Sequence, residues 1–132
     1  MIGAIIGDYV GSIYEWNNIK TTDFPFFSPT CRFTDDSVMS VAVADALMND
    51  TDLAASLRKY GRMFPQAGYG GRFREWLRND AAPDYGSFGN GSAMRASAAG
   101  WMASTLEEAL ELARQSALPT HSHPEGIRGA QV

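Results

Sequence analysis

The sequence predicts a mostly helical protein that folds as a single domain over residues 1–132. Three observations support this prediction. Apolar residues recur every three or four positions along most of the chain. Residues that favour helix starts stand directly before several of these runs. A length of 132 residues suits one domain with a sizeable core.

The first two segments are a glycine-bearing helix and a long loop. Residues 1–12 carry Gly3, Gly7 and Gly11, whose four-residue spacing places them on one helix face. Close packing against another helix explains such a face better than contact with a ligand. Residues 17–32 contain two prolines and three phenylalanines, so we expect a loop whose rings fix it to the body of the domain.

The middle of the chain predicts three helices. Residues 36–48 are apolar on all sides, which is typical of a central, buried helix. Thr51 or Asp52 can cap the next helix. A glycine-rich turn at 68–71 precedes a third helix around Trp76.

The second half continues with a polar loop over 80–90 and a helix rich in small residues over 92–103. Ser104 and Glu107 have the three-residue spacing of a capping box. The helix that follows them has an inner stripe that begins at Leu106.

The last predicted helix opens at Pro124, because proline is favoured in the first helical position. No glycine, basic cluster or proline closes it before Val132. We therefore expect this chain to be part of a longer protein, or to complete itself against another chain.

Composition narrows the partners and the location. The net charge is −4, with Lys and Arg scattered along the chain, which gives no reason to expect nucleic acid or an anionic membrane. The single cysteine, Cys31, favours a reducing, cytoplasmic setting. No apolar stretch is long enough to cross a membrane, and no basic segment introduces a signal peptide.

Thr34, Asp35, Asp36 and Ser37 form the sharpest local feature. Adjacent carboxylates and hydroxyls are the hard oxygen ligands that Mg²⁺, Mn²⁺ and Ca²⁺ prefer. The same residues are also good helix caps, and spacing alone favours capping. The apolar helix behind them favours a metal, because paired anions at the mouth of a core repel each other unless a cation joins them.

Three further features are weaker on their own. Glu15 follows the glycine-bearing helix, and it is either a general base, a metal-facing gate or a solvated surface residue. The stretch over 85–92 can present backbone N–H groups to a phosphate, but it lacks the end of a P-loop, and an ordinary flexible loop explains these residues at least as well. His121 and His123 favour a ligand-facing or capping role over zinc, and Cys31 favours a structural role.

The ordered set of these segments resembles the ADP-ribosylglycohydrolase family. The matching stretches are Gly3 to Asp8, Gly11-Ser12 with Glu15, Phe33 to Ser37, Gly89 to Arg95 and Thr120 to Gly126. The resemblance implies an all-α bundle of orthogonal helices with a centre of two Mg²⁺ or Mn²⁺ ions in a cleft.

The resemblance also implies roles for single residues. Thr34, Asp35 and Asp36 match the first metal-ligand motif, and Glu15 matches an acidic residue on the loop that covers the metals. Asp35, Asp36 and Glu15 are therefore the expected catalytic residues. The expected ligand-binding residues are Gly86, Ser87, Phe88, Gly89, Asn90 and His121.

The implied activity is hydrolysis that releases ADP-ribose from modified protein side chains or cleaves related bonds. The family's second metal motif, of the Asp-x-Asp-Thr type, has no counterpart here, since no aspartate follows Asp84. We therefore expect an incomplete, inactive site in this chain. The alternatives are a non-catalytic ADP-ribose or nucleotide binder, and a crystallin-like structural protein that forms a homo-oligomer through an incomplete bundle face.

Overall fold

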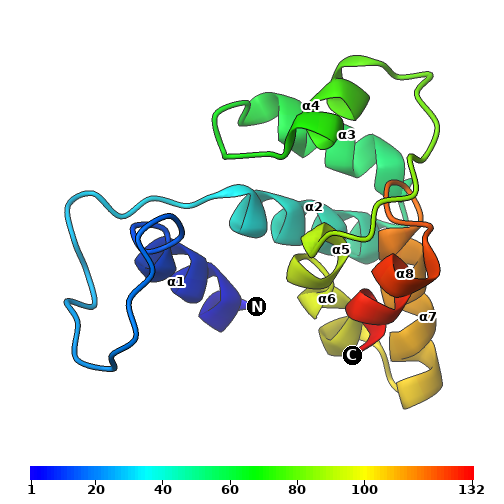
Figure 1. The fold of residues 1–132 in the computed structure, drawn as a ribbon. Helices are drawn as coiled ribbons and strands as arrows, with labels where there is room; N and C mark the ends of the chain where they lie inside the picture. The colour runs from blue at the N-terminus through cyan, green and yellow to red at the C-terminus, as the bar shows by residue number, and fades with distance from the viewer.

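A computed structural model describes residues 1–132, and it confirms the all-α prediction with eight helices and no strand. Figure 1 shows α2 through the middle of the molecule, with α3 and α4 on one side and α5 to α8 on the other. The helices are α1 (Ile2–Gly11), α2 (Asp35–Asn49), α3 (Leu53–Met63), α4 (Gly71–Arg78), α5 (Gly91–Met94), α6 (Ser97–Met102), α7 (Leu106–Ala117) and α8 (Pro124–Gln131).

The prediction of a central, buried second helix is confirmed. α2 contacts α1, α3, α5 and α6, and eight of its residues are buried. Because its sequence is apolar all round, it has no polar face that must stay in water. Its N-terminal end is left at the surface of the core, where Thr34 caps it by accepting the Asp36 N–H at 3.3 Å.

Two apolar clusters hold the helices together. The larger one joins α2, α3 and α4 and is built around Met39, Val43, Leu57 and Trp76. The smaller one lies between α6, α7 and α8 and consists of alanines, namely Ala99, Ala113, Ala117 and Ala130. Small side chains let these helix backbones approach closely, so the C-terminal part forms a tight unit beside α2.

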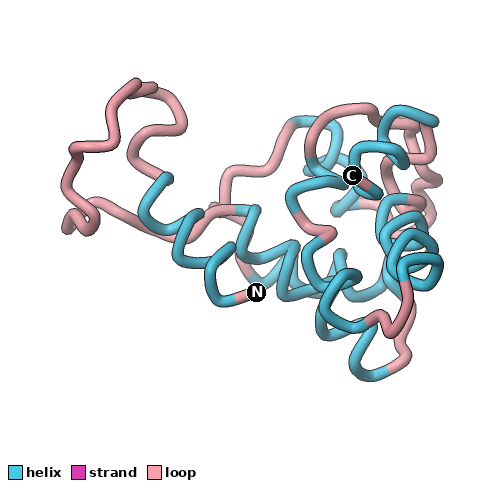
Figure 2. The backbone as a smooth tube through the Cα atoms, turned by 90° about the horizontal axis from the view of Figure 1, so that it is seen from below, coloured by secondary structure: helices cyan, strands magenta, loops and turns pink.

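α1 lies against α2 and away from α3 to α8, and the loop after it extends outward from the rest of the molecule (Figure 1 and Figure 2). The prediction of close helix packing on the glycine face is wrong for this structure. A Cβ atom added at Gly3, Gly7 or Gly11 would meet no atom within 4 Å. The glycine face is therefore open.

The loop over 12–33 is attached mainly to α1. Tyr9 and Phe27 have ring centroids 6.4 Å apart, and Tyr14 and Phe24 are 5.4 Å apart. Only the first pair joins the loop to α1, because Tyr14 lies in the loop itself. Phe26 and Phe27 are 58% and 66% exposed, so these rings do not fix the loop to the body of the domain as predicted.

Two details of the C-terminal helices differ from the predictions. The helix expected over 92–103 is broken into α5 and α6, because the chain turns at Arg95 so that its guanidinium can reach the Ser116 carbonyl at 2.8 Å. The capping box is one residue later than expected. Thr105 accepts the Glu108 N–H at 3.1 Å, and the Glu108 carboxylate accepts the Ser104 N–H at 2.7 Å.

The predicted inner stripe of α7 lacks its first member. Leu106 is the first helical residue and is 69% exposed, so it does not belong to the inner stripe. Other boundaries match the predictions: Asp52 caps α3, and Pro124 opens α8. None of the helices combines the length and hydropathy of a membrane span.

Candidate functional site

The N-terminus of α2 is organised by Asp8, a carboxylate from α1. One Asp8 oxygen accepts the Thr34 N–H at 2.8 Å and the Ser37 hydroxyl at 2.5 Å, and the other accepts the Thr34 hydroxyl at 2.6 Å. The Ser37 N–H also donates to Asp8, at 3.1 Å. These bonds satisfy donors that a helix start leaves free, so Asp8 fixes the position of the two aspartates between them.

Asp35 and Asp36 line different spaces. Asp35 lines a cavity of about 310 Å³, called here the main cavity. Asp36 lines a separate space, called here the acidic hollow, together with Asp8, Glu15 and Thr34. The structure thus gathers Thr34, Asp36 and Glu15 in the acidic hollow and places Asp35 in the main cavity instead.

Burial and mutual repulsion raise the pKa of both aspartates. The pKa of Asp35 rises from 3.8 to about 6, first because of burial and then because of the charges of Asp36, Glu15 and Asp8. The pKa of Asp36 is also raised, by burial and by the charge of Asp8. No basic side chain contributes to either shift. The cluster therefore has unbalanced negative charge, which a bound cation would relieve.

The donor atoms suit a hard cation, but they form only part of a ligand set. Thr34, Asp35 and Asp36 offer carboxylate and hydroxyl oxygens, the donors that Mg²⁺ and Mn²⁺ prefer. No three His, Cys, Asp or Glu side chains converge closely enough to enclose a metal ion. The residues present fit one face of a metal centre.

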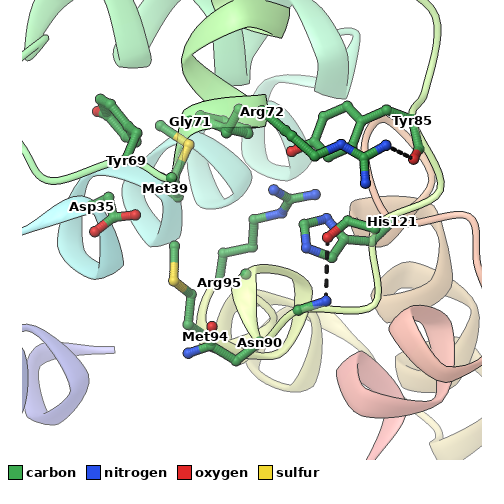
Figure 3. A pocket seen from close by; sticks show the side chains of 15 residues that line it. Asp35, Met39, Tyr69, Gly71, Arg72, Tyr85, Asn90, Met94, Arg95 and His121 are labelled. Carbon is green, nitrogen blue, oxygen red and sulfur yellow. Dashed lines mark hydrogen bonds between the residues drawn. The ribbon is translucent and has the colours of Figure 1, made fainter.

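The main cavity extends from Asp35 to the glycine loop and His121 (Figure 3). Its wall includes the first turn of α4, where Gly70 provides no side-chain cap. Uncapped N–H groups at a helix start favour an anion. The residues that line it include Asp35, Gly71, Ser87, Asn90, Arg95 and His121.

The loop over 85–90 forms part of the wall of this cavity through Tyr85, Ser87, Gly89 and Asn90. Gly86 has φ +58°, a left-handed conformation that favours glycine. The Gly89 N–H donates to the Ser87 hydroxyl at 3.2 Å, while the N–H groups of Phe88 and Asn90 have no acceptor in the chain. The loop can therefore donate hydrogen bonds to an anionic ligand.

Two residues outside the loop hold it in place. The Asp84 carboxylate accepts the Gly86 N–H at 3.1 Å, and also accepts the backbone N–H and the hydroxyl of Ser122. Gly126 of α8 lies directly beneath, where an added Cβ would be 2.5 Å from the Ser87 carbonyl oxygen. The loop, the 121–123 turn and α8 thus form one packed unit.

His121 and Arg95 form a buried pair at the closed end of the main cavity. The Thr120 hydroxyl lies 2.8 Å from His121 Nδ1 and accepts a hydrogen bond from Arg95 at 3.0 Å. Burial, followed by the Arg95 charge, lowers the pKa of His121 to about 4, so the ring is neutral at pH 7. Figure 3 shows the Arg95 guanidinium turned into the cavity.

The remaining predicted residues lie outside the main cavity. Phe88 is 71% exposed, and its ring centroid is 5.1 Å from that of His123. His123 caps α8 by accepting the Glu125 N–H, which confirms the capping role that was one of the two predicted for the histidines. Gly86 shapes the loop without lining the cavity. Cys31 is buried beside the Val10 carbonyl, which agrees with a structural role.

Sequence reasoning did not single out Asp8, Asp84 or Arg95 as functional. Asp8 and Arg95 lie in two of the stretches that resemble the ADP-ribosylglycohydrolase family, and only that resemblance could have indicated a functional role for them. Asp84 is the last aspartate in the chain and directly precedes the glycine loop. Its contact with Ser122 joins residues 38 apart, which no local pattern indicates.

Comparison with known proteins gives a consistent result. A family model described as ADP-ribosylglycohydrolase matches residues 1–132. ADP-ribosylhydrolase ARH3 of Mus musculus is 26% identical over 165 residues, covering 98% of this chain and 45% of the mouse protein. The Xenopus tropicalis ARH3 is 24% identical, and the Homo sapiens ARH3 is 26% identical. In each case the match covers 98% of this chain and 46% of the relative, so the chain spans about half the length of these proteins.

Proposed function

The chain belongs to the ADP-ribosylglycohydrolase family, and from that premise we propose that it forms the ligand-holding half of a metal-dependent ADP-ribosyl hydrolase. The observation that carries the proposal is the position of Asp35. It lines the same cavity as Ser87, Asn90 and His121, while its neighbour Asp36 faces the acidic hollow. A ligand in the main cavity would thus reach the carboxylate cluster.

The main cavity suits the diphosphate and a ribose of ADP-ribose. The backbone N–H of Asn90, together with the first turn of α4, offers donors that a diphosphate needs. The buried Arg95 guanidinium adds positive charge to the cavity wall. His121 is neutral at pH 7, so its free ring nitrogen can bond a sugar hydroxyl without adding charge.

Thr34, Asp35 and Asp36 would hold Mg²⁺ or Mn²⁺ through their oxygens. Metal bound there would position the ribose hydroxyls and polarise a water for attack on the anomeric carbon. Asp35 approaches the ligand side, and Asp36 approaches the acidic hollow. Since the carboxylates of this chain form one face of such a centre, we propose that the isolated chain binds metal weakly and does not turn over substrate.

Glu15 lines the acidic hollow and contributes to the raised pKa of Asp35. It lies on the loop after α1, the part of the molecule that stands away from the main body. In the proposed function Glu15 is a metal-facing carboxylate that accepts a proton from the attacking water.

A second candidate function is ADP-ribose or nucleotide binding without catalysis. The observation that favours it is that the glycine loop, α4 and His121 form the main cavity within this chain, whereas the carboxylates enclose no complete metal site. On this reading, affinity for ADP-ribose does not depend on a metal ion.

Titration calorimetry with ADP-ribose, with and without Mn²⁺, separates the two candidates. We expect binding in both conditions and tighter binding with Mn²⁺ in the wild type, with the Mn²⁺ effect lost in Asp35→Asn. Ser87→Ala removes the hydroxyl that holds Gly89 and weakens binding in both conditions. Ser104→Ala serves as the control, because its exposed hydroxyl makes no hydrogen bond and lies outside the main cavity.

An Mn²⁺ effect that survives in Asp35→Asn would contradict the metal assignment. Equal affinity with and without Mn²⁺ in the wild type would favour the non-catalytic binder. A longer protein that contains this chain should release ADP-ribose from a modified protein in the presence of Mg²⁺ or Mn²⁺. If that protein binds two metal ions and still releases no ADP-ribose, the hydrolase function is ruled out.

A further inference from the structure

Basic residues are concentrated in one part of this chain, so the sequence-based description of Lys and Arg as scattered along it is wrong. Six of the eleven Lys and Arg residues lie within 58–78, a stretch that contains one acidic residue, Glu75. The chain as a whole has a net charge of −4. The segment formed by α3, the following loop and α4 is therefore strongly positive within an acidic molecule.

Three of these arginines line one hollow of about 320 Å³, which we call the arginine hollow. Arg62 comes from α3, and Arg74 and Arg78 come from α4. Arg62 is already engaged, since it donates to the Leu77 carbonyl at 2.7 Å and to Asp80 at 2.5 Å. Arg74 and Arg78 make no side-chain hydrogen bond or ion pair.

Tyr69, which also lines this hollow, has a buried hydroxyl without a partner. Tyr69 is 2% exposed, and its hydroxyl makes no hydrogen bond. Figure 3 shows this hydroxyl turned away from Asp35 and from the main cavity. A buried hydroxyl without a partner costs free energy that a polar ligand would recover. It is an observation independent of the arginines.

The arginine hollow is distinct from the main cavity, although the two are neighbours. Gly71, Arg72 and Phe73 of α4 line the main cavity, whereas Arg74 and Arg78 line the hollow. Tyr69 alone contributes to both. The two sides of one short helix thus face two different spaces.

We propose that the arginine hollow is a second anion site, which binds a phosphate or diphosphate group. Guanidinium groups match phosphate geometry through paired N–H donors, and two of them here are unoccupied. The Tyr69 hydroxyl supplies a further donor from the wall. Nothing in the family-based function requires this site, and it stands whether or not the main cavity binds ADP-ribose.

Titration of pyrophosphate into the ¹⁵N-labelled chain tests the proposal, with the arginine side-chain Nε–H signals as the readout. We expect the signals of Arg74 and Arg78 to shift in a saturable manner, with or without saturating ADP-ribose. Phosphoserine is the second probe, and we expect weaker binding because it carries a single phosphate. The Arg74→Gln/Arg78→Gln variant should bind pyrophosphate at least about tenfold more weakly.

The matched control is Arg114→Gln/Arg128→Gln, which removes the same charge from exposed positions on α7 and α8. Tyr69→Phe should weaken pyrophosphate binding several-fold, because the ring stays and only the hydroxyl is lost. The proposal is overturned if the two double variants bind pyrophosphate equally well, or if ADP-ribose displaces it from Arg74 and Arg78. Loss of ADP-ribose binding alone would count against the proposed function and leave the second anion site intact.

Discussion

At the scale of single residues, the site depends on how negative charge is arranged around the start of α2. Asp8 accepts hydrogen bonds from two N–H groups and two hydroxyls, all from Thr34 and Ser37. Asp35 and Asp36 have far fewer donors and correspondingly raised pKa values. Asp8 therefore acts as a structural carboxylate, and it leaves its two neighbours available for a ligand.

Asp8→Asn should lower the free energy of unfolding by about 1–3 kcal/mol, because charge-assisted bonds are lost and an amide N–H₂ faces donors. It should also lower the pKa of Asp36, since the charge of Asp8 raises it in the wild type. Urea unfolding at pH 7 and a carboxyl NMR titration measure the two effects. Asp23→Asn is the control, because the Asp23 side chain lies on an exposed loop. Equal stability of the two variants would contradict the structural role of Asp8.

Asp35 should make the metal-free protein less stable as pH rises. Its pKa of about 6 in the folded state lies above the ordinary value of 3.8. Between these values the folded state binds more protons than the unfolded state, so stability falls with rising pH through that window. Asp35→Asn should therefore stabilise the protein by about 1–2 kcal/mol at pH 7.5, after allowance for solvent screening, and by less at pH 4.5.

Thermal unfolding at the two pH values, without added metal, measures this difference. A variant that is stabilised equally at pH 4.5 and pH 7.5 would show that the gain is not electrostatic. Asp45→Asn is a suitable control, because Asp45 sits later on the same helix and pairs with Lys59.

The carboxylate pair could be predicted because its signal is local. Two adjacent aspartates before an apolar helix indicate both a cap and a cation site, and the structure shows Thr34 capping while the aspartates face the two spaces. Asp8 could not be predicted in the same way. Its contacts join residues 26 and 29 positions apart, so they depend on how α1 lies against α2.

At the scale of elements, the glycine loop is held in shape by its neighbours. Asp84 joins Gly86 of the loop to Ser122, and α8 supports the loop through Gly126. The loop depends on α8, which follows it by more than thirty residues, so a change in that helix should alter ligand binding.

Gly126→Ala should displace the loop, because the new Cβ would stand 2.5 Å from the Ser87 carbonyl oxygen and 2.9 Å from that of His121. Backbone atoms cannot move aside as a flexible side chain can. We expect a loss of about 1–3 kcal/mol in stability and weaker ADP-ribose binding. Chemical denaturation and titration calorimetry measure the two effects.

Gly129→Ala on the same helix is the matched control. Its added Cβ would meet only Ala93 Cβ, at 4.0 Å, and alanine favours helix more than glycine does. That variant should be as stable as the wild type or more so, with unchanged ligand binding. If Gly126→Ala behaves like Gly129→Ala, the loop does not rest on α8 as described.

Helix positions were largely predictable, because apolar spacing and caps are local signals. The break between α5 and α6 was not, since it follows from the burial of Arg95 against Ser116, a residue 21 positions away. The capping box on α7 was displaced by one residue, because both Ser104 and Thr105 can cap and sequence alone does not rank them.

At the scale of the whole molecule, the functional spaces lie on both sides of one helix end. The acidic hollow joins α1 to the start of α2, and the main cavity joins that same start to α4, the glycine loop and His121. α1 makes its helix contacts with α2. The geometry of the acidic hollow therefore depends on how firmly α1 is held.

The exposed face of α1 is apolar. Ile2, Ile6 and Tyr9 follow at helical spacing and are 75%, 41% and 37% exposed. Gly7 and Gly11 of the same helix line the acidic hollow, so the apolar stripe is formed by Ile2, Ile6 and Tyr9. Such a stripe in water favours association, so we predict that the chain self-associates through α1.

Sedimentation equilibrium over a range of concentrations measures this association. We expect the average mass to rise with concentration in the wild type and to stay monomeric in Ile2→Ser/Ile6→Ser. Met48→Ser/Met63→Ser is the control, because these methionines are similarly exposed but belong to α2 and α3. A wild type that is monomeric at every concentration would contradict self-association. Association that survives in the α1 variant would place the contact on another surface, and α1 would then be held by α2 alone.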